Sequence, residues 1–271
     1  MRKAHLSALP YLVWSILFTV VPLILVIGFA VTDRSNHLTF ANFEQMGIYT
    51  TVFVRSVVLA LISTLLSLII GYPVAYILSR EPAKRQNTML MLIMLPMWMN
   101  FLLRTYAWLT LLENNGLINR FLGIFGIGPL HMINTQGAVV LGMVYNYMPY
   151  MILPIYSVLV KLDHRLIEAA QDLGATPRRC FLKVVFPLSM PGVMSGVIMV
   201  FMPSVSTFII SKMLGGGSNL LIGDLIEMEY LGNAYNPHLG AAISLVMMII
   251  ILISMWAMGF QKGDDKEVMV I

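Results

Sequence analysis

Six long apolar segments dominate the sequence and limit what it can fold into. Each reaches the roughly 20 residues that an α-helix needs to cross a bilayer. They cover residues 10–31, 56–79, 88–112, 136–160, 188–211 and 239–260. Only 11% of the residues are charged, far below the quarter that is typical of a water-soluble domain. Because backbone groups in lipid must bond within their own segment, the sequence predicts an all-α membrane protein with six transmembrane helices.

Lysine and arginine are distributed unevenly among the connecting segments. With the N-terminus in the cytoplasm, twelve basic residues lie on the cytoplasmic side and five outside, which accounts for all 17. The opposite orientation would break the positive-inside rule at nearly every loop. We therefore expect both termini and residues 161–187 to be cytoplasmic. No soluble domain or internal repeat is visible, so residues 1–271 are expected to form a single transmembrane domain, with the first apolar segment retained as a helix rather than cleaved as a signal peptide.

The expected cytoplasmic loop before the fifth apolar segment is unusually polar. Asp163 can cap a helix that ends at Gly174, and Thr176 followed by Pro177 can start a second helix, which Pro187 is expected to close. The first helix would carry an apolar face of Leu166, Ile167, Ala170 and Leu173. This pattern predicts a helix–turn–helix. It fits either a docking element for a partner or an amphipathic hairpin whose basic residues, Arg178, Arg179 and Lys183, touch anionic lipid.

A known signature decides between these two interpretations. Glu168-Ala169-Ala170, then Gly174 after three residues, then Val184-x-Phe186-Pro187 after nine more, resembles the EAA signature of ABC importer permeases. The family usually ends this signature with Ile-x-Leu-Pro, so Val184 and Phe186 are mild departures. The resemblance implies a type I ABC importer permease fold in which the loop is a coupling helix that docks into the cytoplasmic ATPase. The coupling residues that it implies are Glu168, Ala169, Ala170, Asp172, Gly174 and Pro187.

Two further stretches narrow the resemblance. LPMWMNFLLRTYAW (residues 95–108) and LGGGSNLLIGDLIEMEYL (residues 214–231) are similar to the B-type subunit of the spermidine/putrescine permeases. This implies a bacterial cytoplasmic membrane protein that works with a second permease subunit, two ATP-binding cassette subunits that use ATP and Mg, an extracytoplasmic substrate-binding protein and a polyamine substrate. A homodimer, in which two copies of this chain replace the pair of different permeases, is the alternative assembly. Neither a cofactor of this chain's own nor a nucleic acid partner is implied.

Aromatic residues toward the outer half of the third segment suit a cationic substrate. An ammonium group over the ring of Trp98, Tyr106 or Trp108 would be attracted by about 0.5–2 kcal/mol. The same rings could instead form part of the usual interfacial belt of a membrane protein. Arg104 would repel a cation in the pathway. It is therefore expected to face away, or to pair with an acid such as Glu113.

The last outer segment is acidic beyond Lys212. Asp224, Glu227 and Glu229 lie within six residues with no base nearby in the sequence, and a short helix would place Asp224 and Glu227 on one face. Such a cluster could concentrate polycations or hold a basic patch of the binding protein. The alternative is an ordinary solvated acidic loop.

Other classes of function find less support in the sequence. The five histidines and the one cysteine show no metal-ligand spacing, and no nucleotide-binding or hydrolase motif is present. An ion-coupled secondary transporter usually carries ionisable residues at mid-membrane, and these segments have almost none. The sequence therefore predicts a non-catalytic permease powered by a separate ATPase. An importer of another small solute, such as an opine or a phosphonate, is the main alternative substrate assignment.

Overall fold

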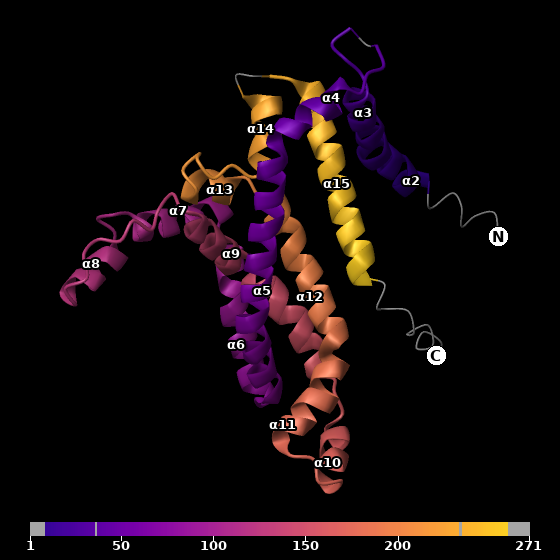
Figure 1. The fold of residues 1–271 in the computed structure, drawn as a ribbon. Coiled ribbons are helices and arrows are strands. Elements are labelled where there is room, and N and C mark those ends of the chain that lie inside the picture. The colour runs from indigo at the N-terminus through magenta and orange to yellow at the C-terminus, as the bar shows by residue number, and fades with distance from the viewer. Residues whose placement is uncertain (1–8, 36, 233–234, 260–271) are drawn as a thin grey trace, which may run out of the picture.

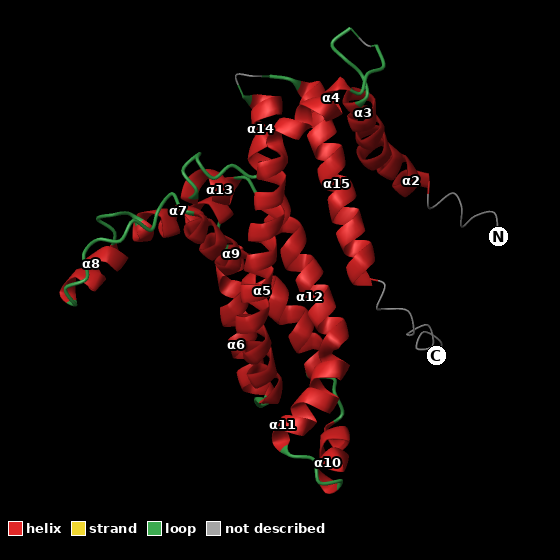
Figure 2. Cartoon of the chain, viewed as in Figure 1, coloured by secondary structure: helices red, strands yellow, loops and turns green. Residues whose placement is uncertain are grey.

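The computed structural model describes residues 9–35, 37–232 and 235–259, and this part of the chain is almost entirely helical (Figures 1 and 2). The helices are α2 (Leu9–Ser15), η1 (Ile16–Val20), α3 (Val21–Ala30), α4 (Ala41–Gln45), η2 (Met46–Tyr49), α5 (Thr50–Arg80), α6 (Ala83–Trp98), α7 (Phe101–Leu112), α8 (Leu117–Ile124), α9 (Gln136–Leu159), α10 (His164–Asp172), α11 (Pro177–Cys180), η3 (Phe181–Val185), α12 (Phe186–Ser206), α13 (Ile209–Leu214), α14 (Ile222–Leu231) and α15 (Pro237–Gly259). Within these residues, β-structure is limited to one bridge between Thr32 and Leu38.

Five helical segments are long and apolar enough to cross a membrane. They are Pro10–Ala30, Ala41–Arg80, Gln136–Leu159, Pro177–Ser206 and Pro237–Ala257. A bent pair of helices, Ala83–Trp98 with Phe101–Ile124, makes a sixth span if it is counted as one. The prediction of an all-α membrane protein is therefore confirmed.

The third predicted span is not one continuous helix. Its two parts meet at an angle of 89°. Met99 is extended, and the Asn100 side chain caps α7 by accepting hydrogen bonds from the N–H groups of Leu102 and Leu103 at 2.8 and 3.4 Å. Hydrophobicity extends across this junction, whereas Asn100 stops one helix and starts another.

The fifth span differs from the prediction at both ends. Pro187 does not close a helix, because α11, η3 and α12 run on as one segment from Pro177 to Ser206. The π-turn η3 makes this possible, since the N–H of Phe186 bonds to the carbonyl of Phe181, one residue farther back than in an α-helix. Pro22 follows η1 in the same way. At the other end α12 stops at Ser206, and Thr207 is extended before the separate helix α13.

The core lies where α5, α9 and α12 pack together. Met143, Met151 and Ile155 of α9 are fully buried there. Small residues let α9 and α12 approach closely: a Cβ added at Gly192 would lie 2.8 Å from the carbonyl oxygen of Pro154. Helices α3 and α15 pack to one side of this core through Ala30, Ala241 and Ala242 (Figure 1).

Candidate functional site

The loop between α9 and α12 stands at one end of the molecule, opposite α4 and α14 (Figure 1). The Asp163 carboxylate accepts a hydrogen bond from the N–H of Arg165 at 3.0 Å, and the Thr176 hydroxyl accepts one from the N–H of Arg179 at 3.4 Å. Gly174 has a φ of +80°, the left-handed conformation that glycine adopts without strain. The predicted helix–turn–helix and its caps are confirmed.

The loop presents a mixed polar and apolar surface. Glu168, Ala169, Asp172 and Gly174 are exposed, and Ala170 is half-buried. The predicted apolar face is only partly covered, because Ile167 packs against the core whereas Leu173 is 90% exposed and Leu166 48% exposed. Exposed leucines among charged residues are suited to docking on another protein.

The loop is joined firmly to the membrane helices. Cys180 is buried beneath α10, with its Sγ 4.0 Å from the carbonyl oxygen of Ile167. Phe181 and Phe186 pack on Tyr72 of α5 with ring centroids 5.8 and 5.7 Å apart. Pro187 is exposed beside them, inside the continuous helix.

A hydrogen bond also connects α5 and α12. The Oη of Tyr72 and the Oγ of Ser189 are 2.8 Å apart. Because the Ser189 hydroxyl donates to the carbonyl of Phe186, Tyr72 is the donor to Ser189. A displacement of the loop would therefore pull on α12 directly and on α5 through this contact.

The acidic helix α14 lies at the opposite end. Glu227 is bonded to Lys212, with the Nζ 2.7 and 3.0 Å from its two carboxylate oxygens, so the expectation that no base lies nearby was wrong. Asp224 is buried, and its Oδ2 accepts a hydrogen bond from the N–H of Leu221 at 2.8 Å, while its Oδ1 has no partner among the described residues. Glu229 is also buried.

Burial changes the acids of α14 electrostatically. It raises the pKa of Asp224, against the opposing effect of the Leu221 N–H, and it raises the pKa of Glu229. Asp224 and Glu227, but not Glu229, line a pocket of about 290 Å³ together with Ser211, Lys212, Gly217, Asn219, Leu220 and Met228. Within the described part of the chain, no group of three or more His, Cys, Asp or Glu side chains could hold a metal ion.

The three aromatic candidates are placed differently from one another. Trp98, at the end of α6, is 69% exposed, and Tyr106 of α7 is 56% exposed. Trp108 instead packs edge-on against Tyr145 of α9, with ring centroids 5.3 Å apart. Trp98 and Tyr106 are therefore free to meet a ligand or another chain, whereas Trp108 already contributes to the packing of α7 on α9.

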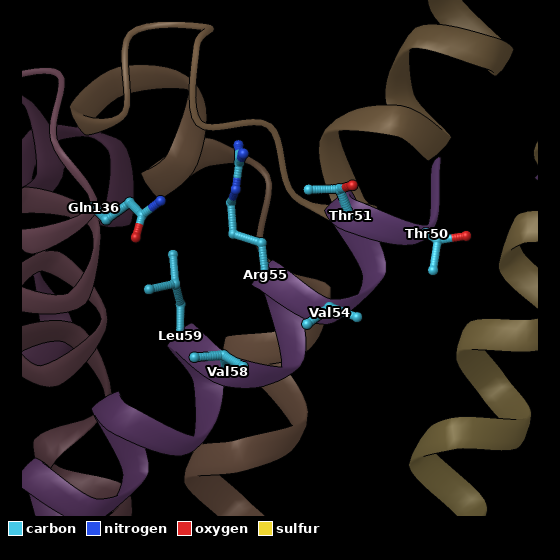
Figure 3. A pocket seen from close by; sticks show the side chains of 7 residues that line it. All are labelled: Thr50, Thr51, Val54, Arg55, Val58, Leu59 and Gln136. Atoms are coloured by element: carbon cyan, nitrogen blue, oxygen red, sulfur yellow. The ribbon is translucent and has the colours of Figure 1, made fainter. Parts of the chain in front are cut away.

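A larger pocket of about 430 Å³ opens beside the first turns of α5 (Figure 3). Val54, Val58 and Leu59 form much of its wall, and Thr50 and Thr51 lie at its edge. Arg55 rises from α5, and Gln136 reaches in from the start of α9, as Figure 3 shows. The Arg55 guanidinium donates to the carbonyl of Ser218 at 3.2 Å. Its positive charge makes this pocket a poor site for a cation.

Arg104 does not form the ion pair with Glu113 that was one of its two expected arrangements. It is only 8% exposed, and the ion pairs among the described residues join Glu81 to Arg85 and Glu227 to Lys212. Its Nε and Nη1 are buried without a hydrogen-bond partner. The sequence shows this arginine inside an apolar segment but gives no sign that it is buried and unpaired.

A helical membrane bundle with a capped loop joined to two of its spans is the arrangement that the EAA-like signature led us to expect. Comparison with known proteins agrees: a family described as "Binding-protein-dependent transport system inner membrane component" matches residues 46–262. The chain therefore belongs to this family of ABC importer permeases of the inner membrane. It is a non-catalytic component of a system that also requires an ATPase and a binding protein.

The similar proteins include one type of permease repeatedly. The chain is 36% identical over 247 residues to the spermidine/putrescine transport system permease protein PotB of Escherichia coli (strain K12), which covers 88% of this chain and 90% of that protein. It is 37% identical to the PotB of Haemophilus influenzae, over 88% of this chain and 86% of that protein. The fold resembles a chain of a bacterial ABC transporter that imports the acidic polysaccharide alginate, with a TM-score of 0.78, 16% identity, and coverage of 98% and 96%.

Proposed function

We propose that this chain is a permease subunit of a polyamine importer whose substrates are spermidine and putrescine. The observation that carries the proposal is the identity of 36–37% with PotB proteins along 88% of the chain. In this proposal residues 1–271 form one transmembrane domain, which lines half of the pathway. A second permease subunit lines the other half, two ATPases bind in the cytoplasm, and a binding protein delivers the substrate outside.

Residues 161–187 form the coupling loop in this proposal, and they lie in the cytoplasm with both termini. The exposed Glu168, Ala169, Asp172 and Gly174 would face the ATPase, and Ala170 would let the two surfaces approach closely. Pro187 would act differently, inside the helix that carries the movement into the membrane. The excess of basic residues on this side supports the orientation.

The opposite end provides groups that suit a polycation. Exposed rings of Trp98 and Tyr106 can attract an ammonium group weakly, which is what a transit site requires. Asp224 and Glu227 line a pocket there, although Lys212 already neutralises part of the charge. Glu229 is buried outside that pocket and Trp108 is packed on Tyr145, so we assign these two a supporting role.

Uptake by the reconstituted transporter tests the proposal. Proteoliposomes that hold the chain with its permease, ATPase and binding-protein partners should accumulate labelled spermidine or putrescine only when ATP is supplied. Glu168→Lys should abolish this uptake at normal insertion, because it reverses a charge on the exposed loop. ATP-driven uptake of a different solute with no uptake of either polyamine would refute the substrate assignment.

A further inference from the structure

Arg104 presents a chemical problem that the described chain does not solve. Its guanidinium stays ionised at any physiological pH and carries five N–H donors. Nε and Nη1 are buried without an acceptor, and the side chain has no hydrogen bond or ion pair within the described residues. The remaining nitrogen, Nη2, is not among the fully buried atoms, so it is the part of the group that reaches the surface.

Among the described residues, no carboxylate forms an ion pair with Arg104. The ring of Phe101 lies 5.8 Å from the guanidinium carbon, near the limit of a cation–π contact. Tyr147 of α9 is within electrostatic range, but its hydroxyl donates to the carbonyl of Pro203. A buried charge without a counter-charge is strongly unfavourable in a membrane-spanning part of a protein.

The surface beside Arg104 is apolar and uncovered. Leu102, Leu103 and Tyr106 are 50, 65 and 56% exposed, and α6, on the other side of the bend, has no buried side chain. A helix of another subunit packed on this surface would bury these side chains and bring its own polar groups to Nη2. A lipid phosphate fits less well, because an arginine that reaches for headgroups keeps its guanidinium exposed, whereas Arg104 is 8% exposed.

We propose that Arg104 forms an ion pair with a carboxylate in a membrane-spanning helix of the second permease subunit. The inference rests on the proposed pairing of two permeases, but not on the identity of the substrate. The ion pair would tie the broken third span of this chain to its neighbour.

Co-purification of the two permeases from detergent measures this contact without any transport assay. Arg104→Gln should weaken the association about a hundredfold or more, as expected when one partner of a buried ion pair is removed. Arg104→Lys, which keeps the charge, should retain most of it. Arg55→Gln is the matched control, because Arg55 also lies in a membrane-spanning helix but bonds to a carbonyl of its own chain. This control should leave the association unchanged.

Charge exchange identifies the carboxylate and excludes a purely structural role. Arg104→Glu should separate the subunits, and replacing one membrane-spanning acid of the second subunit with arginine should restore their association. If none of those replacements restores it, or if Arg104→Gln associates like the wild type, the inference is wrong. It is also wrong if association of the wild type in nanodiscs requires anionic phospholipid and that of Arg104→Gln does not. Failure of the wild-type chain to associate with any second permease would instead refute the proposed assembly.

Discussion

The contact between α9 and α12 at Gly192 gives a prediction whose size can be worked from the structure. An added Cβ would lie 2.8 Å from the carbonyl oxygen of Pro154 and 3.0 Å from the Cα of Ile155, and both neighbours are backbone atoms that cannot move without moving α9. Overpacking of this kind costs about 1–3 kcal/mol. The change to alanine also removes the cost of a helical glycine, which is about 1 kcal/mol.

The matched control is Gly28→Ala in α3, where an added Cβ meets nothing within 4 Å. Both variants gain the same helix propensity, so the difference between them isolates the steric cost. At about 2–4 °C per kcal/mol, the melting temperature of Gly192→Ala should lie roughly 2–12 °C below that of Gly28→Ala. Thermal unfolding of the purified protein, followed by size-exclusion chromatography, measures this difference. A melting temperature of Gly192→Ala equal to or above that of Gly28→Ala would show that the two helices are not in close contact.

Three further predictions concern the loop, the acidic helix and the orientation. Gly174→Asp should abolish ATP-driven uptake at normal insertion. A residue with a side chain pays about 1–2 kcal/mol to adopt the left-handed conformation of Gly174, so the substitution would shift the loop. Normal uptake by this variant would contradict the prediction. Burial raises the pKa of Asp224, so the folded state binds its proton more tightly than the unfolded state. The stability of the protein should therefore fall as pH rises from the ordinary carboxyl range toward neutrality. Asp224→Asn should flatten this dependence of the melting temperature on pH, and an unchanged slope would refute the assignment. The orientation can be tested in a Cys180→Ser background with single cysteines at Ile48 and Leu173, two exposed positions at opposite ends of the molecule. A membrane-impermeant thiol reagent applied to intact cells should label Ile48→Cys and not Leu173→Cys. The reverse labelling would show that the predicted orientation in the membrane is wrong.

Local chemistry made the helix–turn–helix of residues 161–187 predictable from the sequence. Asp163 and Thr176 cap helices through hydrogen bonds to N–H groups two and three residues away, and Gly174 is a left-handed residue next to the helix that it ends. These interactions depend on neighbours in the sequence, so the pattern of residue types is sufficient. Pro187 was misjudged because the effect of a proline depends on the turn before it, and a π-turn has no residue signature of its own.

Contacts between distant residues account for the other errors. Glu227 is neutralised by Lys212, 15 residues earlier, because α13 and α14 lie side by side, which composition does not reveal. Cys180 falls in a polar stretch of the sequence, yet it lies buried under α10. The bend of the third span did have a local signal, since Pro96 followed by Asn100 is a helix end followed by a cap. The apolar residues around it hid that signal in a hydropathy pattern.

The structure divides the chain into a firmly packed part and a part that remains uncovered. A displacement that begins at α11 enters α12 without a break in the helix, reaches α5 through the Tyr72 hydroxyl, and reaches α9 through the close contact at Gly192. These three helices should therefore move together. The third span is different, because α6 buries none of its side chains and Arg104 lacks a counter-charge within the described chain. Since the packed helices already satisfy one another, the uncovered surface around the broken span is where we propose that a second permease subunit packs.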